Sequence, residues 1–134
     1  MYLYSFEKLE VWKLSREYVS EVYDCTKKFP SKERYGLCSQ LERSAVSVMS
    51  NIAEGTSRTS NKEKKRFIEI AFGSLMENYN QLYASLDQKY ISNDLFIKLK
   101  EKVHSIGRML NALKNSYKPT PILNFFNFLH IINL

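Results

Sequence analysis

The stretch from Asn51 to Glu77 places the strongest constraint on the fold, because it contains the end of one helix and the start of another. Residues 51–55, Asn-Ile-Ala-Glu-Gly, are typical of a helix that ends at a glycine. Residues 60–63, Ser-Asn-Lys-Glu, match a capping box, in which serine and glutamate side chains satisfy free N–H groups of a new helix. The stretch therefore predicts two helices joined by a short turn, and it contains no cofactor-binding or catalytic motif.

The composition favours a single helical domain. A chain of 134 residues is within the usual range of one domain. Its content of 44% hydrophobic and 25% charged residues is that of a globular protein. Only four glycines and three prolines are present, which disfavours a loop-rich or all-β structure.

Apolar residues recur with helical spacing in four segments, residues 6–28, 32–54, 61–90 and 93–117. Pro30 ends the first segment, while Ser31 and Ser92 are expected to cap the helices that follow them. Gly73 stands alone within the third segment and is expected to permit close helix packing. Because the turns are short, consecutive helices should be antiparallel neighbours. The predicted fold is all-α, an antiparallel up-down-up-down four-helix bundle.

The predicted bundle covers residues 1–118, and an apolar tail covers residues 119–134. Pro119 and Pro121 stop the fourth helix. The apolar part of the tail is too short to span a bilayer, which takes about 20 residues. We expect the tail either to pack on a neighbouring subunit or to remain disordered, with no membrane attachment.

The first two helices carry more apolar surface than an intramolecular core requires. Their apolar residues occupy about half of the helix circumference, whereas a core-facing stripe usually covers a little over 100°. A second copy of the chain is the simplest partner for the surplus. We predict that Trp12, Tyr18 and Tyr23 lie between subunits.

The sequence contains little that supports catalysis or metal binding. His104 and His130 are the only histidines, and neither belongs to a recognisable metal-binding motif. Glu54 and Glu77 are expected to be structural and to pair with Arg43 or Arg66. We therefore predict no enzyme activity, no cofactor and no metal.

Cys25 and Cys38 lie on different predicted helices without CxxC spacing. Both are expected to be buried, reduced thiols rather than a disulfide or a metal pair.

Positive charge is concentrated around the second turn. The chain has a formal net charge of +6 and a pI near 9.3. The predicted nucleic-acid-binding residues are Arg58, Lys62, Lys64, Lys65 and Arg66. Such a cluster can neutralise phosphates, and the alternative is a solvated face that keeps the protein soluble.

Several motifs, taken in order, resemble one protein family. They are residues 6–12 (Phe-Glu-Lys-Leu-Glu-Val-Trp), Phe29-Pro30, Tyr35-Gly36-Leu37, Gln40-Leu41 with Arg43, residues 51–55, and Gly73-Ser74-Leu75 with Glu77, Gln81 and Leu82. Over residues 6–117 the chain resembles the four-helix bundle proteins encoded in intervening sequences of bacterial 23S rRNA genes. It departs from their usual pattern at Asn78, commonly leucine, and at Tyr79, commonly glutamate.

The resemblance implies a left-handed bundle that assembles as a homopentamer. The same family includes the accessory variability determinant of diversity-generating retroelements, a basic pentamer that binds nucleic acid and a reverse transcriptase. No enzymatic activity is associated with the family. A ribosomal-protein label on some members reflects the location of the gene.

The leading hypothesis is a cytoplasmic, non-enzymatic homopentamer that binds RNA or DNA through its basic surface. We predict a cytoplasmic protein because residues 1–10 lack the basic segment and apolar run of an export signal. The alternatives are an interaction scaffold that docks an acidic protein, such as a reverse transcriptase, and a member with no retained cellular role.

Overall fold

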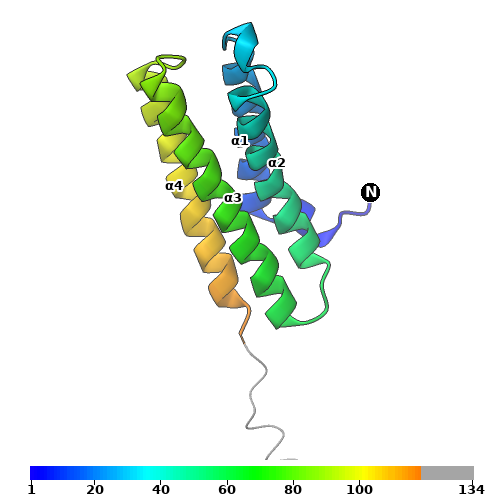
Figure 1. Ribbon diagram of the computed structural model, residues 1–134. Coiled ribbons are helices and arrows are strands. Elements are labelled where there is room, and N and C mark those ends of the chain that lie inside the picture. Colours follow the sequence, from blue (N-terminus) through cyan, green and yellow to red (C-terminus); the bar gives the residue numbers. More distant parts are fainter. Residues whose placement is uncertain (119–134) are drawn as a thin grey trace, which may run out of the picture.

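The computed structural model describes residues 1–118 of the 134, and within them it confirms an all-helical bundle (Figure 1). The four long helices are α1 (Glu10–Thr26), α2 (Leu37–Thr56), α3 (Asn61–Asp87) and α4 (Asn93–Ser116). Two short 3-10 helices, η1 (Ser5–Lys8) and η2 (Ser31–Glu33), precede α1 and α2. In the described part of the chain, none of the helices is long and apolar enough to cross a membrane. The expectations for the tail, residues 119–134, lie outside the described residues.

The helix starts show which capping signals operate. Ser60 Oγ accepts a hydrogen bond from the backbone N–H of Glu63 (3.1 Å), and Ser92 Oγ accepts one from Leu95 (3.1 Å), so both serines cap helices as predicted. Ser31 does not cap α2. It lies in η2, and the carboxylate of Glu33 accepts the hydrogen bond from the N–H of Leu37 instead (3.1 Å).

Contacts at both ends of the bundle establish how the helices lie. In Figure 1 the chain rises along α1, descends along α2, rises along α3 and descends along α4. Asn61 Nδ2, at the start of α3, donates to the carbonyl oxygen of Lys118, just after α4 (2.7 Å). At the opposite end the rings of Phe29 and Tyr90 lie 5.2 Å apart. Among the pairs of long helices that pack together, α2 and α3 have the most extensive contact, and α1 and α4 have the least extensive.

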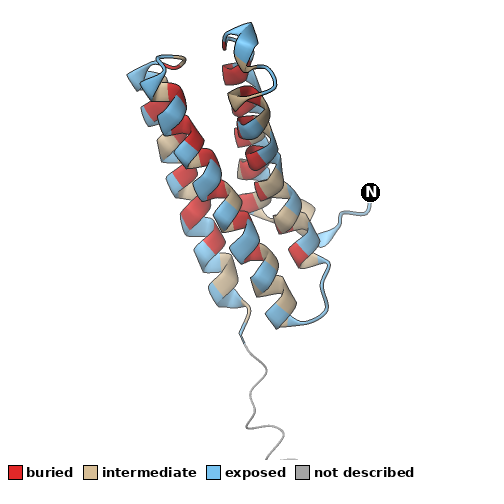
Figure 2. Ribbon diagram, in the orientation of Figure 1, coloured by how far each residue is buried: buried red, intermediate tan, exposed pale blue. Residues whose placement is uncertain are grey.

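The core consists of the predicted apolar stripes, which face inward along the bundle (Figure 2). Each of the four helices contributes several side chains with almost no exposed surface, and burial of each stabilises the fold by about 1.5–3 kcal/mol. The largest fully buried apolar residues are Leu41, Ile52, Ile68, Leu75, Leu82, Leu99, Ile106 and Leu110. Phe96 of α4 is also buried.

The glycine that permits close helix packing is Gly55 rather than Gly73. A Cβ atom on Gly55 of α2 would lie 2.9 Å from the Cβ of Phe67 on α3, too close for any other residue without movement. A Cβ atom on Gly73 would meet nothing within 4 Å. The prediction that Gly73 permits close helix packing is therefore wrong, because Gly73 is exposed and faces no neighbouring helix of the described chain.

A buried polar network joins α1, α2 and α3. Asn78, fully buried on α3, accepts a hydrogen bond from the hydroxyl of Tyr18. Its amide nitrogen donates to the carbonyl oxygen of Leu41 (2.9 Å) and to Ser44 Oγ (3.0 Å). Ser44 Oγ in turn donates to Gln81 Oε1 (2.7 Å). Each polar atom thus keeps a partner, as burial requires.

Replacing Gly55 by alanine should reduce the free energy of unfolding by about 1–3 kcal/mol, because the added methyl group overpacks the α2–α3 contact. Gly73→Ala is the matched control. It should raise the free energy of unfolding by up to about 1 kcal/mol, since alanine is the better helix former and the space is open. Urea unfolding followed by circular dichroism, at one protein concentration, measures both. A Gly55→Ala variant as stable as the wild type would contradict the close contact.

Candidate functional site

The five predicted basic residues lie together at one end of the bundle. Arg58 follows the last turn of α2, and the other four occupy the first two turns of α3. The Ser60 cap starts α3 directly after the turn, so the order along the chain brings these side chains to one end. The hydrogen bond between Asn61 and the carbonyl of Lys118 places the end of α4 beside them.

Two of these basic side chains lie against one aromatic ring. The guanidinium carbon of Arg58 is 4.6 Å from the centre of the Phe67 ring, and that of Arg66 is 6.0 Å from it. Arg58 also lies 3.8 Å from a carboxylate oxygen of Glu54, and Arg66 lies 3.6 Å from one of Glu63. Both pairs are largely exposed, so each contributes about 0–1 kcal/mol and leaves the arginine able to exchange partners.

The lysines differ in their surroundings. Lys64 Nζ lies 5.5 Å from the centre of the Tyr117 ring, at the end of α4. Within residues 1–118, Lys62 and Lys65 form no ion pair. These two lysines therefore offer positive charge that no carboxylate in the described part of the chain neutralises.

The predicted site did not include two further basic residues, Lys114 in the last turn of α4 and Lys118 just after the helix. Lys114 Nζ lies 3.9 Å from a carboxylate oxygen of Glu69. The basic end, as we call this surface, comprises Arg58, Lys62, Lys64, Lys65, Arg66, Lys114 and Lys118. It carries seven basic side chains against the three carboxylates of Glu54, Glu63 and Glu69. The predicted antiparallel order places the end of α4 near the start of α3, but only the packing of the two helices shows that Lys114 reaches this surface.

The three residues predicted between subunits lie in different environments. Tyr18 has no exposed surface, and its hydroxyl group is bound to Asn78 within the core of the same chain. The prediction for Tyr18 is therefore wrong, because α1 packs against α2 and α4, and the Tyr18 hydroxyl reaches Asn78 of α3 inside the same bundle. Trp12 is half-buried, with its ring 5.0 Å from that of Phe6, and Tyr23 is 41% exposed. Trp12 and Tyr23 remain predicted interface residues.

Glu54 and Glu77 have other partners than those expected. Glu54 pairs with Arg58, and Glu77 accepts a hydrogen bond from Gln81 Nε2 (3.3 Å). One Glu-x-x-His spacing is present, at Glu101 and His104, and both residues are exposed on α4. Among the described residues, no cluster of three or more His, Cys, Asp or Glu side chains is arranged to hold a metal ion.

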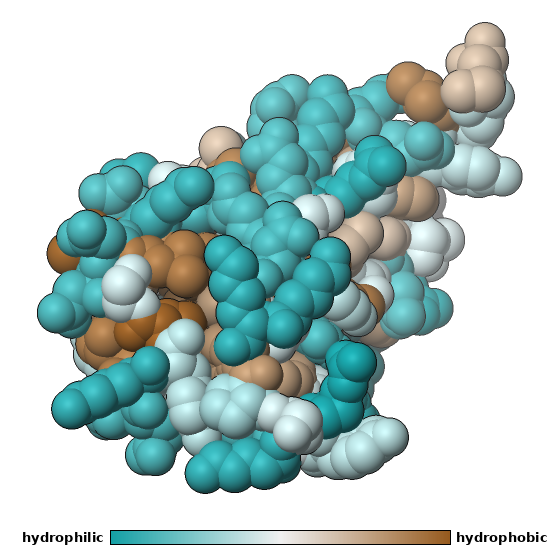
Figure 3. Space-filling view, turned by 90° about the horizontal axis from the view of Figure 1, so that it is seen from above, coloured by the Kyte–Doolittle hydropathy of each residue, from teal (hydrophilic) through white to brown (hydrophobic). Residues whose placement is uncertain are grey.

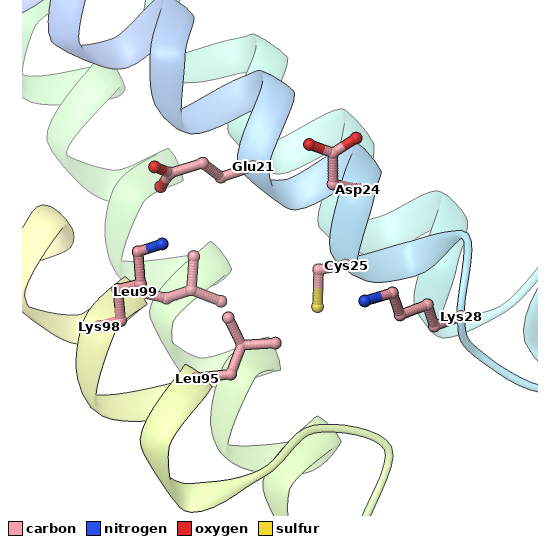
Figure 4. A pocket seen from close by; sticks show the side chains of 7 residues that line it. All are labelled: Glu21, Asp24, Cys25, Lys28, Leu95, Lys98 and Leu99. Atoms are coloured by element: carbon pink, nitrogen blue, oxygen red, sulfur yellow. The ribbon is translucent and has the colours of Figure 1, made fainter.

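A cavity of about 160 Å³ lies between the end of α1 and the start of α4 (Figure 4). It is at the opposite end of the bundle from the basic end. Its lining residues are Glu21, Asp24, Cys25, Lys28, Leu95, Lys98 and Leu99. Burial, and then the nearby Cys38, raises the pKa of the Cys25 thiol to about 11. The thiol is therefore protonated at neutral pH and is a poor nucleophile. Four of the seven lining residues are charged, so the cavity does not resemble an apolar ligand site.

The fold and the basic end define a small, basic helical-bundle protein. Comparison with protein families matches residues 7–112 to the 23S rRNA-intervening sequence proteins. The match covers most of the chain, so the protein belongs to this family, as the sequence motifs predicted. The family description refers to the intervening sequence and names no activity.

Among solved structures, the fold resembles a protein of unknown function from the S23 ribosomal protein family of Bacteroides thetaiotaomicron. The two chains are 19% identical, with a TM-score of 0.72, and the alignment covers 78% of this chain and 97% of the other. At that identity the likeness concerns the fold alone. A comparison with curated proteins gave no match.

Both thiols should react slowly in the native protein. Burial raises the pKa of Cys38 as well as that of Cys25, and both are free and buried. For Cys25 the rate of alkylation should keep rising as the pH approaches 11, because the thiolate forms only there. Mass spectrometry after timed alkylation, with a urea-unfolded sample as control, measures this. Equal rates in native and unfolded protein, or recovery of the two cysteines as a disulfide, would contradict the prediction.

Proposed function

We propose that this protein is a cytoplasmic, non-enzymatic homo-oligomer, a pentamer by family resemblance, that binds RNA or DNA through its basic end. The observation that carries the proposal is the convergence of seven basic side chains on one end, from α3, from α4 and from the residues that follow α2 and α4, against three carboxylates. The whole chain has a net charge of +6, so this end holds most of the surplus positive charge. Nucleic-acid phosphates are the partners that such a surface neutralises most readily.

The arrangement supports phosphate contacts rather than base recognition. Lys62 is exposed and Lys65 half-buried, and neither is held by a carboxylate among the described residues. Arg58 and Arg66 hold weak pairs from which a phosphate can take them, while the Phe67 ring keeps both guanidinium groups at the surface. The positive end of the α3 dipole adds to the same field. Phosphate contacts carry no base information, so binding should depend little on sequence.

Assembly would multiply these contacts. A ring of copies repeats the basic end, so contacts that are weak in one chain become collective. In one chain, the partly exposed rings of Trp12 and Tyr23 on α1 supply apolar surface for a neighbour. Since the two surfaces use different helices, assembly and nucleic-acid binding can be tested separately.

Changing Lys64, Lys65 and Arg66 together to alanine should weaken binding to RNA and DNA to a similar extent across sequences. The slope of log affinity against log salt should also flatten, by up to about 0.9 for each duplex-DNA phosphate that the variant no longer neutralises. Filter binding at several salt concentrations measures both quantities. The matched control removes three charges at the other end of the bundle, Lys27, Lys28 and Lys32 to alanine, and should change both far less.

The proposal would be refuted if the Lys64, Lys65 and Arg66 triple variant stayed folded and assembled and kept the wild-type affinity and salt slope. In that case the basic end is a solubilising face or a docking face for an acidic protein. The family resemblance suggests a reverse transcriptase as such an acidic partner. A pull-down with that partner would then be the next measurement.

Sedimentation equilibrium at micromolar concentration should give a mass about five times the 15.8 kDa of one chain. Tyr23→Glu should lower that mass, because it places a charge on the predicted interface. Tyr35→Glu is the control, since Tyr35 is 96% exposed and lies on a turn outside the predicted interface. A wild-type protein that sediments only as a monomer would refute the oligomer.

A further inference from the structure

An aromatic cluster lies on the outer face of α3 and α4, away from the basic end. Tyr79 and Tyr83 belong to the second half of α3, and Phe96 and His104 to the first half of α4. The ring centres of Tyr83 and Phe96 are 4.8 Å apart, those of Tyr79 and Tyr83 are 5.1 Å apart, and those of Tyr79 and His104 are 6.1 Å apart. Figure 1 shows the two helices side by side over this region.

The cluster has a buried base and an exposed top. Phe96 is only 7% exposed, so it anchors the rings in the core. Tyr83 is 43% exposed, and His104 is also exposed. A hydrogen bond between the hydroxyl groups of Tyr79 and Tyr83 (3.2 Å) raises the pKa of Tyr83 and fixes the two rings relative to each other. The exposed aromatic surface is therefore preorganised on regular helices, which lowers the entropy lost on binding.

Positive charge borders the same surface. Lys100 faces Tyr83 closely enough to oppose the rise in the pKa of that tyrosine, and it forms no ion pair within residues 1–118. We name Tyr79, Tyr83, Phe96, Lys100 and His104 together the stacking surface. Aromatic rings flanked by lysine are the combination that single-strand-binding proteins use, because every base has a face that stacks on a ring.

The stacking surface and the basic end lie along one seam between α3 and α4. Lys65 and Tyr83 are 18 positions apart on α3, which is about 27 Å at 1.5 Å per residue. Next to the basic end the seam has a cavity of about 160 Å³, lined in part by Phe72, Asn111 and Lys114. At the duplex rise of about 3.4 Å per nucleotide, a fully stacked single strand needs roughly eight nucleotides to cover the distance, and a more extended strand needs fewer.

We infer that the stacking surface binds unpaired bases of single-stranded nucleic acid whose phosphates are held by the basic end. The inference rests on the proposed function and adds a substrate class to it. Duplex bases are already stacked and paired, so they cannot use the tyrosines. A second copy of the chain docked face to face would bring two Lys100 ammonium groups together, which disfavours that occupant.

The test compares Tyr83→Leu with the wild-type protein. The probes are a 12-nucleotide oligo(dT) that contains one 2-aminopurine, its duplex form and an oligo(U) of equal length. The variant should bind both single strands about 5- to 150-fold more weakly, the equivalent of one base stack. Quenching of 2-aminopurine should be reduced as well. Duplex affinity should not change, and a four-nucleotide probe should bind weakly to both proteins.

Three other variants keep the test decisive. Tyr83→Phe retains the ring but loses the hydrogen bond to Tyr79, so it should bind single strands much more tightly than Tyr83→Leu does. Lys100→Ala should weaken single-strand binding without changing the rings. Tyr35→Leu removes another exposed tyrosine and should have no effect. Circular dichroism and sedimentation establish that each variant is folded and assembled.

The outcomes separate this inference from the proposed function. If Tyr83→Leu keeps wild-type affinity and quenching while the Lys64, Lys65 and Arg66 triple variant loses binding, the stacking surface is refuted and the basic end stands. If neither variant loses binding, both fail. If Tyr83→Leu changes only the sedimenting mass, the surface is an interface between copies, and the inference is overturned.

Discussion

The close contact between α2 and α3 is the constraint on which the rest of the structure depends. Gly55 has no side chain, so the backbone of α2 approaches Phe67, and farther along Ser47 and Ser74 meet through their hydroxyl groups at 2.8 Å. The same Phe67 ring lies beneath the two arginines of the basic end. A residue larger than glycine would move Phe67, and with it the guanidinium groups. Packing and the proposed phosphate contacts are thus coupled through one ring.

The polar network around Asn78 gives this contact its register. The side-chain amide of Asn78 donates to a carbonyl and a hydroxyl group on α2 and accepts from Tyr18 on α1. All three hydrogen bonds form in only one arrangement of the three helices. A shift along α3 would leave buried polar atoms without partners, at about 1–3 kcal/mol each. A leucine at this position would give apolar burial and no such selection of register. Figure 3 shows the end of the bundle opposite the basic end. Apolar side chains are exposed there, and hydrophilic side chains surround them.

Helix α3 carries both surfaces on which the proposals rest. Its first turns hold most of the basic end, and its last turns hold the two tyrosines of the stacking surface. Since the helix is regular over 27 residues, the distance between the surfaces is fixed rather than set by a flexible linker. Helix α4 contributes to both as well, through Lys114 and through Phe96, Lys100 and His104. A single rigid pair of helices would present charge and aromatic rings in a constant order.

The sequence by itself determined the four helices, their apolar stripes, the caps at Ser60 and Ser92 and the family. These features follow from local spacing, since a period of 3.6 residues shows which side chains share a face. The tertiary structure alone decided which face meets which helix. It buried Tyr18 beside Asn78, assigned the close contact to Gly55 instead of Gly73, and brought Lys114 to the basic end. Periodicity identifies an apolar or basic face, but the partner of that face depends on how distant segments pack, and no local pattern records it.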